Sequence, residues 1–392
     1  TADYNTAVGR SALSANTTAD SNAAFGAYSL RDNTTGTQNT ALGAFAVREN
    51  TTANDNTGVG YAALVLNTTG TRNTAVGSLA LDASTTASDN TAVGYDAAGA
   101  ITTGDLNVAI GKGAMGSNTV GDRNVAIGAN ALYSYNPSSN EDGYNVAIGL
   151  NALNVTTTGN NNTAVGGKAL EANTTGTSNV AVGAYALDAI TTGSNSVAIG
   201  YEALSAHTAA QPSVAVGRGA LKSNVTGQYN VAVGDRALED NTANFNTAVG
   251  GFALYKNTTA ASNTAFGYAA LEQNTTGEYN TAIGAAALDL NTTSSNNTAV
   301  GYNALTTNTA GNNTGIGYKA LEANTTGSDN VAVGTGALVA NTTGTNNTAV
   351  GKDALNDATT GGQNTAAIED VEYIQKKLFA ALKIPKAYLG YD

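Results

Sequence analysis

Hydrophobic and polar positions recur along the chain with a period of 17 residues. The motif Asn-Thr-Ala-Val-Gly first occurs at Asn5, and the last of its 22 starts is Asn364. Eighteen of the 21 intervals between starts equal this period, and the exceptions are one longer interval (124 to 145) and two shorter ones (230 to 246 and 297 to 313). Full copies therefore extend over residues 1–363, and a fixed period of this kind indicates a repeat architecture.

Each copy follows the consensus N-T-A-V-G-x-x-A-L-x-x-N-T-T-G-x-x, whose positions we number 1 to 17. Positions 1 to 5 have the period of a strand, and positions 6 to 9 form a second short apolar segment. Asn-Thr-Thr-Gly then supplies turn-forming residues, among which Gly accepts a positive φ. Because both apolar runs are too short for a helix, the pattern predicts two strands and two turns per coil. The predicted fold is an all-β parallel β-solenoid (β-roll) of about 21 rungs.

Stacked copies would place equivalent residues about 4.8 Å apart, the spacing of neighbouring strands. Position 3 is Ala in every full copy except those with Gly58 and Gly315, which indicates a confined place. Position 9 is Leu in 18 full copies and would fill the interior, and columns of Asn can form amide ladders. Positions 2 and 4 lie on the strand face opposite position 3, and the sequence does not decide which face is inside.

The outer strand face, whichever it is, would form a continuous stripe of small apolar residues. A stripe of that length is seldom left in contact with water. We therefore expect self-association, in the simplest case as a parallel homotrimer.

A different pattern follows Gly361. Apolar residues at 368, 371, 374, 378 and 382 have helical spacing, and Pro385 would end the helix. The predicted domains are a β-roll at 1–363 and a short C-terminal amphipathic helix with its tail at 364–392. Such a helix could cap the open end of the solenoid or trimerise it.

The composition excludes several classes of function. The 392 residues contain 17 Lys and Arg against 29 Asp and Glu, and this net charge of −12 argues against nucleic-acid binding by the repeats. No Cys is present and His207 is the only His, so neither a thiolate site nor a His-rich metal site can form. We expect no enzyme activity, no cofactor, no metal and no membrane insertion by this part of the chain.

The longest interval, 124 to 145, contains an insertion that interrupts the regular pattern. Its residues Tyr133, Tyr135, Glu141, Asp142 and Tyr144 combine aromatic faces with carboxylates, a combination that suits a sugar. A tolerated surface insertion explains the same residues without a ligand, and the sequence favours that interpretation. Tyr also recurs directly after the Gly of position 5, where it could line a weaker carbohydrate surface or pack at a corner of the coil: Tyr61, Tyr95, Tyr201, Tyr268, Tyr302 and Tyr318.

Other features have structural explanations. His207 stands in the column of position 12, usually Asn, and we expect an exposed turn residue there. The Asn-Thr-Thr triplets match the N-glycosylation pattern, although turn formation explains them without a sugar. Ice binding would need alternating Thr with both hydroxyls on one face, whereas the paired Thr of each copy are adjacent. The acidic residues at variable positions indicate a solvated face, for example Asp82, Asp188, Glu202 and Glu239.

Several copies, including Asn107-Val-Ala-Ile-Gly111 and Ser196-Val-Ala-Ile-Gly200, resemble the motif of trimeric autotransporter adhesin heads. The variant with Ala-Leu-x-x-Asn-Thr-Thr-Gly is similar to bacteriophage tail-fibre repeats. The resemblance covers about 360 residues. It implies a left-handed, trimeric β-roll on a virion or bacterial cell surface that binds a host glycan or protein. The chain begins inside a repeat at Thr1, so we expect a fragment of a longer protein.

The C-terminal segment has a resemblance of its own. Residues 361–391, which include Ile368-Glu-Asp-Val-Glu-Tyr and Ile384-Pro-Lys-Ala-Tyr, resemble part of the portal proteins of large tailed bacteriophages. In that family, portals form a ring at the capsid vertex through which DNA passes. The resemblance covers about 30 residues and points to a phage genome. It implies an alternative function, a virion-assembly protein related to portals that carries an added β-roll.

Overall fold

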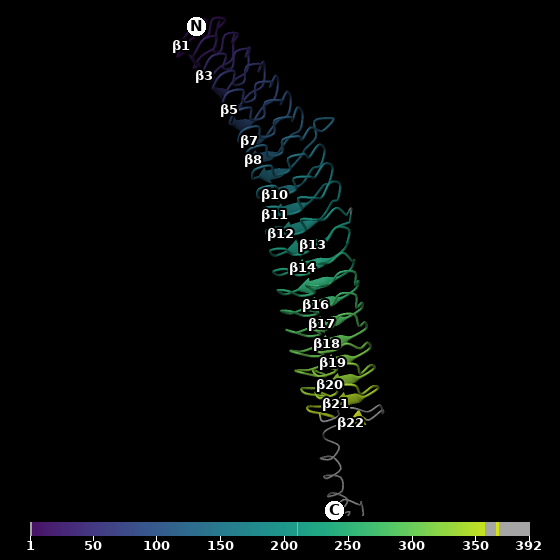
Figure 1. The fold of residues 1–392 in the computed structure, drawn as a ribbon. Coiled ribbons are helices and arrows are strands. Elements are labelled where there is room, and N and C mark those ends of the chain that lie inside the picture. The colour runs from purple at the N-terminus through teal and green to yellow at the C-terminus, as the bar shows by residue number, and fades with distance from the viewer. Residues whose placement is uncertain (1, 210, 357–365, 368–392) are drawn as a thin grey trace, which may run out of the picture. The chain divides into compact units, whose positions relative to one another are not determined.

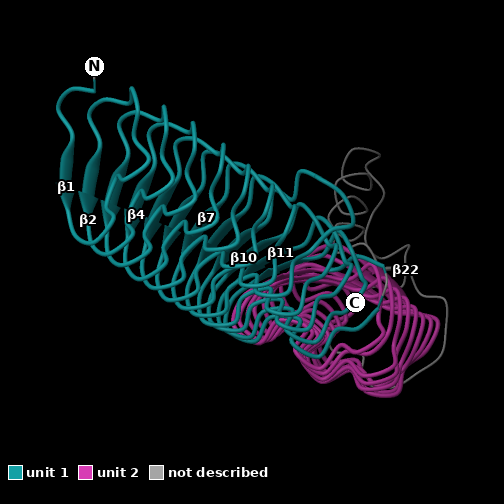
Figure 2. Ribbon diagram, turned by 90° about the horizontal axis from the view of Figure 1, so that it is seen from above, with its two compact units in different colours: residues 1–213 teal, residues 214–392 magenta. Residues whose placement is uncertain are grey.

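The structure is a computed structural model of the chain, and it describes residues 2–209, 211–356 and 366–367. The chain divides into two compact units, Thr1–Ser213 and Val214–Asp392, which Figure 2 colours separately. Each unit is an all-β parallel β-solenoid in which one copy of the repeat forms one coil, and the described residues of both units contain no helix. The predicted β-solenoid class is confirmed for each unit.

Each rung contributes one strand, formed by positions 2 to 4 of the repeat, and Figure 1 shows these strands stacked rung upon rung within each unit. The strands of unit 1 are β1 (Thr6–Val8), β2 (Ala23–Phe25), β3 (Thr40–Leu42), β4 (Thr57–Val59), β5 (Thr74–Val76), β6 (Thr91–Val93), β7 (Val108–Ile110), β8 (Val125–Ile127), β9 (Val146–Ile148), β10 (Thr163–Val165), β11 (Val180–Val182) and β12 (Val197–Ile199). The strands of unit 2 are β13 (Val214–Val216), β14 (Val231–Val233), β15 (Thr247–Val249), β16 (Thr264–Phe266), β17 (Thr281–Ile283), β18 (Thr298–Val300), β19 (Thr314–Ile316), β20 (Val331–Val333), β21 (Thr348–Val350) and β22 (Ala366–Ala367).

Neighbouring strands within a unit pair in parallel, with each motif position beside its equivalent. Ala75 of β5 lies beside Ala92 of β6, for example. The register also survives the longest interval, because Ala126 of β8 lies beside Ala147 of β9. The extra residues of that interval therefore leave the sheet as a loop, and the buried face sets the register of the strands.

The structure shows which strand face is inside. The Ala of position 3 is completely buried in most strands, as at Ala75, whereas positions 2 and 4 point outward. The space around the side chain of position 3 is confined, as the sequence indicates. Where Gly58 replaces this Ala, a Cβ would lie only 2.6 Å from Cγ2 of Val47, which occupies the vacated space.

The second predicted strand, at positions 6 to 9, is wrong, because these residues form a turn. Positions 7 and 9 have positive φ, as at Leu79 (60°) and Leu81 (49°). Consecutive side chains of a strand point to opposite faces, yet Ala80 and Leu81 are both completely buried. The left-handed backbone turns both side chains into the core, and single hydrogen bonds between rungs continue around the coil, such as Leu81 N to Ala97 O at 3.0 Å.

The glycine that requires a positive φ is the one at position 5. Gly77 has a φ of 143°, and a Cβ there would lie 2.2 Å from the carbonyl oxygen of Gly94 in the next rung. The Gly of Asn-Thr-Thr-Gly, which the sequence predicts at positive φ, does not adopt it, as Gly70 shows. Its role is close packing, since a Cβ on Gly70 would lie 2.0 Å from the carbonyl oxygen of Ala87.

The Asn columns form the predicted ladders inside each unit. At position 1, the backbone N–H of Asn90 donates to Oδ1 of Asn73 at 3.0 Å, and Nδ2 of Asn90 donates to Gly104 O at 2.8 Å. At position 12, Nδ2 of Asn67 donates to Oδ1 of Asn50 at 2.9 Å. Buried amides need such partners, and these bonds within and between rungs supply many of them, although Oδ1 of Asn67 accepts none.

The predicted helix at 368–382 and the rest of the tail to residue 392 lie outside the described residues. β22 pairs in parallel with β21, with Thr348 beside Ala366, but the predicted division at 363/364 stays a prediction. Among the described residues, no helix has the length and apolar character needed to cross a membrane.

Candidate functional site

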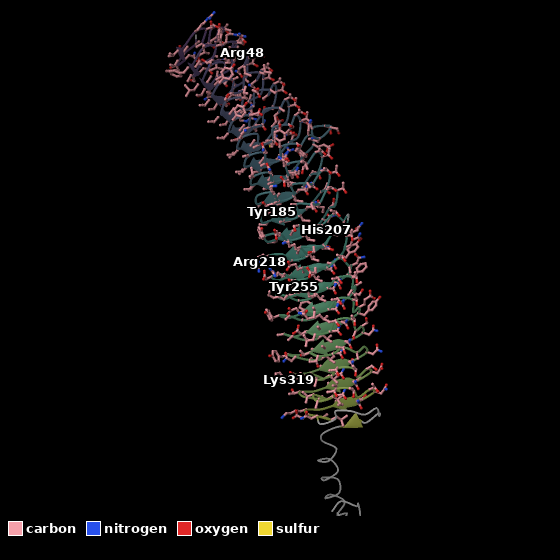
Figure 3. The ribbon with its side chains drawn as sticks, in the orientation of Figure 1. Arg48, Tyr185, His207, Arg218, Tyr255 and Lys319 are labelled. Atoms are coloured by element: carbon pink, nitrogen blue, oxygen red, sulfur yellow. The ribbon has the colours of Figure 1, made fainter. Side chains whose placement is uncertain are left out.

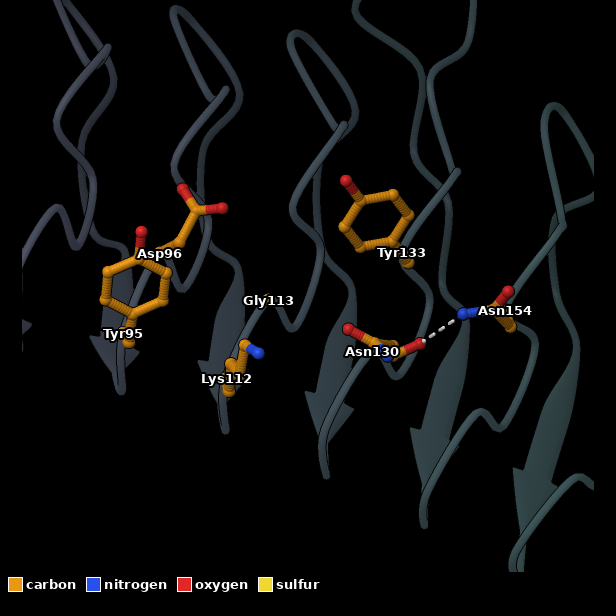
Figure 4. Close-up of a pocket in the computed structure, with 7 residues that line it drawn as sticks. All are labelled: Tyr95, Asp96, Lys112, Gly113, Asn130, Tyr133 and Asn154. Carbon is orange, nitrogen blue, oxygen red and sulfur yellow. Dashed lines mark hydrogen bonds between the residues drawn. The ribbon is translucent and has the colours of Figure 1, made fainter.

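A pocket of about 360 Å³ lies on the surface of unit 1. It extends over the rungs that carry β6 to β9, and Figure 4 shows its lining: Tyr95, Asp96, Lys112, Gly113, Asn130, Tyr133 and Asn154.

Missing side chains in one rung create this pocket. Gly113 stands at position 7 with a φ of 62°, where the neighbouring rungs carry Asp96 and Asn130. Gly116 stands at position 10 of the same rung, and a Cβ there would lie 2.6 Å from Cε2 of Tyr133. The Tyr133 ring therefore leans over Gly116, and the missing side chain of Gly113 leaves a hollow bordered by Asn130 Oδ1 and the Tyr133 ring, which would lie 3.0 Å and 3.7 Å from a Cβ there.

The pocket holds two charged groups without ionic partners. Among the described residues, neither Lys112 nor Asp96 forms an ion pair, whereas Arg218 contacts Asp235 at 2.8 Å in another rung. Asn154 is fixed, because its Nδ2 donates to the carbonyl oxygen of Asn130 at 3.0 Å (Figure 4). The pocket thus offers a cation, a carboxylate and amides to a ligand at its surface.

The structure separates the five residues that the sequence grouped in the insertion. Tyr133 lines the pocket and is 37% exposed, and Tyr144 and Glu141 are exposed. Tyr135 lies in the core at 1% exposure, and burial raises the pKa of its hydroxyl to about 12. Its ring is therefore closed to a ligand from solvent, which corrects its place among the candidate contacts. No single site contains all five residues.

The acidic residues of the insertion already have partners. Asp142 forms an ion pair with Arg123, and the Tyr144 hydroxyl donates to Oδ2 of Asp142 at 2.9 Å. Glu141 accepts a hydrogen bond from the Ser139 hydroxyl at 2.8 Å. The ion pair with Arg123 ties the loop to the preceding rung, and all three contacts engage its carboxylates within the chain.

The Tyr column after position 5 is exposed throughout, as at Tyr95 and Tyr268. Some of its rings contact one another, and Tyr302 and Tyr318 stack at 5.7 Å between centroids. Sequence reasoning identified Tyr95 and Tyr133 separately but missed Asp96 and Lys112 beside them. The available signal was the pair of glycines at positions 7 and 10 of one copy.

His207 is not the exposed turn residue that its column predicts. Its side chain, labelled in Figure 3, is completely buried. Its backbone N–H donates to Leu204 O at 3.1 Å. The reason is that position 12 points inward beneath the turn. The asparagines of the Asn-Thr-Thr triplets at the same position are also buried, so their side-chain amides are not accessible for glycosylation in the folded chain: Asn33, Asn67, Asn173, Asn257 and Asn341.

The expectation of a solvated acidic face is wrong at position 10. Asp82 and Asp188 are half-buried, and desolvation raises the pKa of each carboxyl. Desolvation, together with the charge of Glu272, raises the pKa of Asp289 to about 6. Glu202 and Glu239 are partly buried as well. No group of three or more His, Asp or Glu side chains in the described part of the chain is placed to hold a metal ion.

The C-terminal end of the chain is similar to a known protein family. The bacteriophage T4-like portal protein family (Gp20) matches residues 350–392, most of which lie outside the described residues. No curated protein matches the chain. The portal-like character of the C-terminal segment is confirmed, and it links the chain to tailed phages.

Proposed function

We propose that this chain is a segment of a structural and adhesive fibre, in which three β-solenoids associate side by side. The observation that carries this proposal is the outward face of the strands. The fibre would provide reach and stiffness, and repeated copies would provide multivalent attachment.

The outward strand face is free of charge along each unit; position 4 is apolar in every full copy, and position 2 is Thr, Val or Ala. No copy has a charged residue at position 2 or 4. In unit 1 the side chains of position 4 include Leu42, which is 50% exposed, and Ile110, which is 37% exposed. Unit 2 has the same exposed column, including Phe266 and Ile316.

A second copy of the chain is the occupant that fits this face. Charged residues are depleted from the cores of protein interfaces, as they are here. Because every rung repeats the same two outward positions, a parallel copy would match it row for row. The exposed apolar column favours association with another chain. That three chains associate is what the resemblance to trimeric adhesin heads implies.

The location and the ligand follow from resemblance. The portal-family match favours a phage virion, where the segment would belong to a tail fibre, over a bacterial surface. A host glycan or protein would be the external partner. We expect no catalysis and no cofactor, because Cys is absent and the single His is buried.

Ile110→Asp tests whether the strand face is the interface. The variant places a charge in the centre of the apolar column, so we expect it to weaken association in sedimentation velocity experiments. Leu150→Asp is the matched control, because Leu150 is 57% exposed but lies at position 6, off the strand face. If both variants dissociated to the same extent, or if neither dissociated, the strand face would not be the interface.

The second candidate function is a virion-assembly protein related to portals, with the β-solenoid as an added domain. The match at residues 350–392 is the observation that favours it. The full reading frame tests it. Portal sequence continuing beyond Asp392, beside capsid and terminase genes, would support assembly, and tail-fibre genes on both sides would support the fibre.

A further inference from the structure

We infer that the pocket over the rungs of β6 to β9 is a binding site for one neutral pyranose sugar. This inference deepens the adhesive part of the proposed function by naming a ligand class. It does not depend on the trimer, since every lining residue comes from unit 1 of one chain.

Two aromatic rings stand on either side of the pocket. Tyr95 belongs to the rung of β6 and Tyr133 to the rung of β8, and Figure 4 shows them on opposite sides of Gly113. The Tyr133 ring leans back over the middle rung, where its edge would lie 3.7 Å from a Cβ on Gly113, so the ligand would lie between this ring edge and Tyr95. Tyr95 is 53% exposed and Tyr133 is 37% exposed, so both can offer ring surface to a ligand.

Polar groups of both kinds lie between the rings. The Asp96 carboxylate can accept hydrogen bonds, the Lys112 ammonium can donate them, and the Asn130 carboxamide can do both. Hydroxyl groups are donors and acceptors at once, so a polyol satisfies this set better than an anion or a cation does. Asp96 and Lys112 have opposite charges, which favours a neutral ligand over a charged one.

The size of the pocket limits the ligand to a single sugar unit. Its volume of about 360 Å³ is near the lower end of the range for small-molecule sites. A single sugar in an open pocket binds weakly, so useful adhesion would come from many copies acting together. The rest of the chain, at a net charge of −12, would repel acidic sugars.

Gly113→Asn is the most direct test, because it fills the pocket at a φ that Asn adopts in this fold; its Cβ would lie 3.0 Å from Oδ1 of Asn130, a side chain that must shift slightly. Asn130 occupies the equivalent position of the next rung with a φ of 54°, so Asn is compatible with the 62° of Gly113. Gly219→Asn is the matched control. Gly219 is at the same position of the repeat with a φ of 65°, and a Cβ there would have no neighbour closer than 3.7 Å.

A second pair of variants removes a ring. Tyr95→Ala deletes one wall of the pocket, and Tyr268→Ala deletes an exposed Tyr from the same column that does not line the pocket. Binding is measured by saturation-transfer NMR titration with three probes, the methyl glycosides of glucose, galactose and mannose. Glucuronate serves as the charged counterpart, and circular dichroism checks the fold of each variant.

We expect saturable binding of at least one neutral glycoside, and a loss of about tenfold or more in affinity for Gly113→Asn and Tyr95→Ala. Gly219→Asn and Tyr268→Ala should keep the affinity of the unchanged chain. Binding of none of the three glycosides would overturn the inference, as would equal binding by Gly113→Asn. Tighter binding of glucuronate would overturn the neutral class. A chain that binds sugar as a monomer would refute the trimer and leave the pocket in place.

Discussion

Leu81 adopts a backbone conformation that Leu rarely has, with a φ of 49°. A left-handed residue of this kind costs roughly 1–2 kcal/mol, whereas full burial of a Leu side chain contributes about 1.5–3 kcal/mol. Burial therefore offsets the strain, and the same balance recurs at the Leu of position 9 in rung after rung. The repeat retains Leu at this position because the coil needs its volume.

Gly77→Ala should destabilise the solenoid by about 3 kcal/mol, from backbone strain together with overlap. The added Cβ would lie 2.2 Å from the carbonyl oxygen of Gly94 in the next rung, and Ala rarely adopts a φ of 143°. Gly167→Ala is the control, because a Cβ there has nothing within 4 Å and its φ is not in the left-handed region. Denaturant midpoints measure both, and an equal effect of the two variants would contradict the packing described for position 5.

Asp289→Asn should stabilise the chain at neutral pH. The pKa of Asp289 is about 6 in the folded state against 3.8 for an ordinary Asp, so the folded state binds this proton more tightly. Its favourable contribution is complete below pH 3.8 and is lost as the pH rises through about 6. The variant should therefore raise the melting temperature at neutral pH and leave it unchanged below pH 3.8.

Asp235→Asn provides the opposite case. The hydrogen bond from Arg218 lowers the pKa of Asp235, so this carboxylate stabilises the fold above its ordinary pKa and loses that effect in acid. In Asp235→Asn the melting temperature at neutral pH should fall only slightly, because the ion pair is exposed.

For Asp289→Asn, a melting temperature that fell at neutral pH would show that burial of this carboxyl has no energetic cost.

At the scale of the rung, the period of the sequence was enough to predict the stack and the register, whereas the burial of the Ala column followed only from the structure, because the sequence left both strand faces as candidates for the interior. It failed at positions 6 to 9, because local propensities do not anticipate Leu81 at positive φ. It also failed at His207, since the inward direction of position 12 follows from that turn. Of the pocket, only Tyr95 and Tyr133 were identified, because its opening depends on Gly113 within a three-dimensional column.

Asn90→Ala should cost about 2 kcal/mol, because it leaves buried backbone groups of two rungs without partners. The amide oxygen of Asn90 accepts from the N–H of Asn107 at 2.9 Å, and its Nδ2 donates to Gly104 O at 2.8 Å. Thr69→Ala, at an exposed position of the repeat, is the control. Hydrogen exchange at Asn107 should speed up in Asn90→Ala only, and unchanged protection would contradict the ladder.

At the scale of the whole molecule, the absences in the composition have one cause. A coil formed by a single copy of the repeat has room for Ala, Leu, Asn and turn formers, and the buried Asn of position 1 bond to the neighbouring rungs, as Asn73 and Asn90 do. What remains for function is the surface, namely the strand face and the pocket on unit 1. The strand face accounts for the proposed fibre, and the pocket accounts for a ligand.

The mass of the chain in solution tests the central claim most directly. Light scattering coupled to size-exclusion chromatography gives that mass without reference to molecular shape. The proposed side-by-side fibre predicts three times the chain mass of 39.0 kDa, held at low protein concentration. A folded, stable monomer of 39.0 kDa would show that the apolar strand face tolerates water and would contradict the fibre.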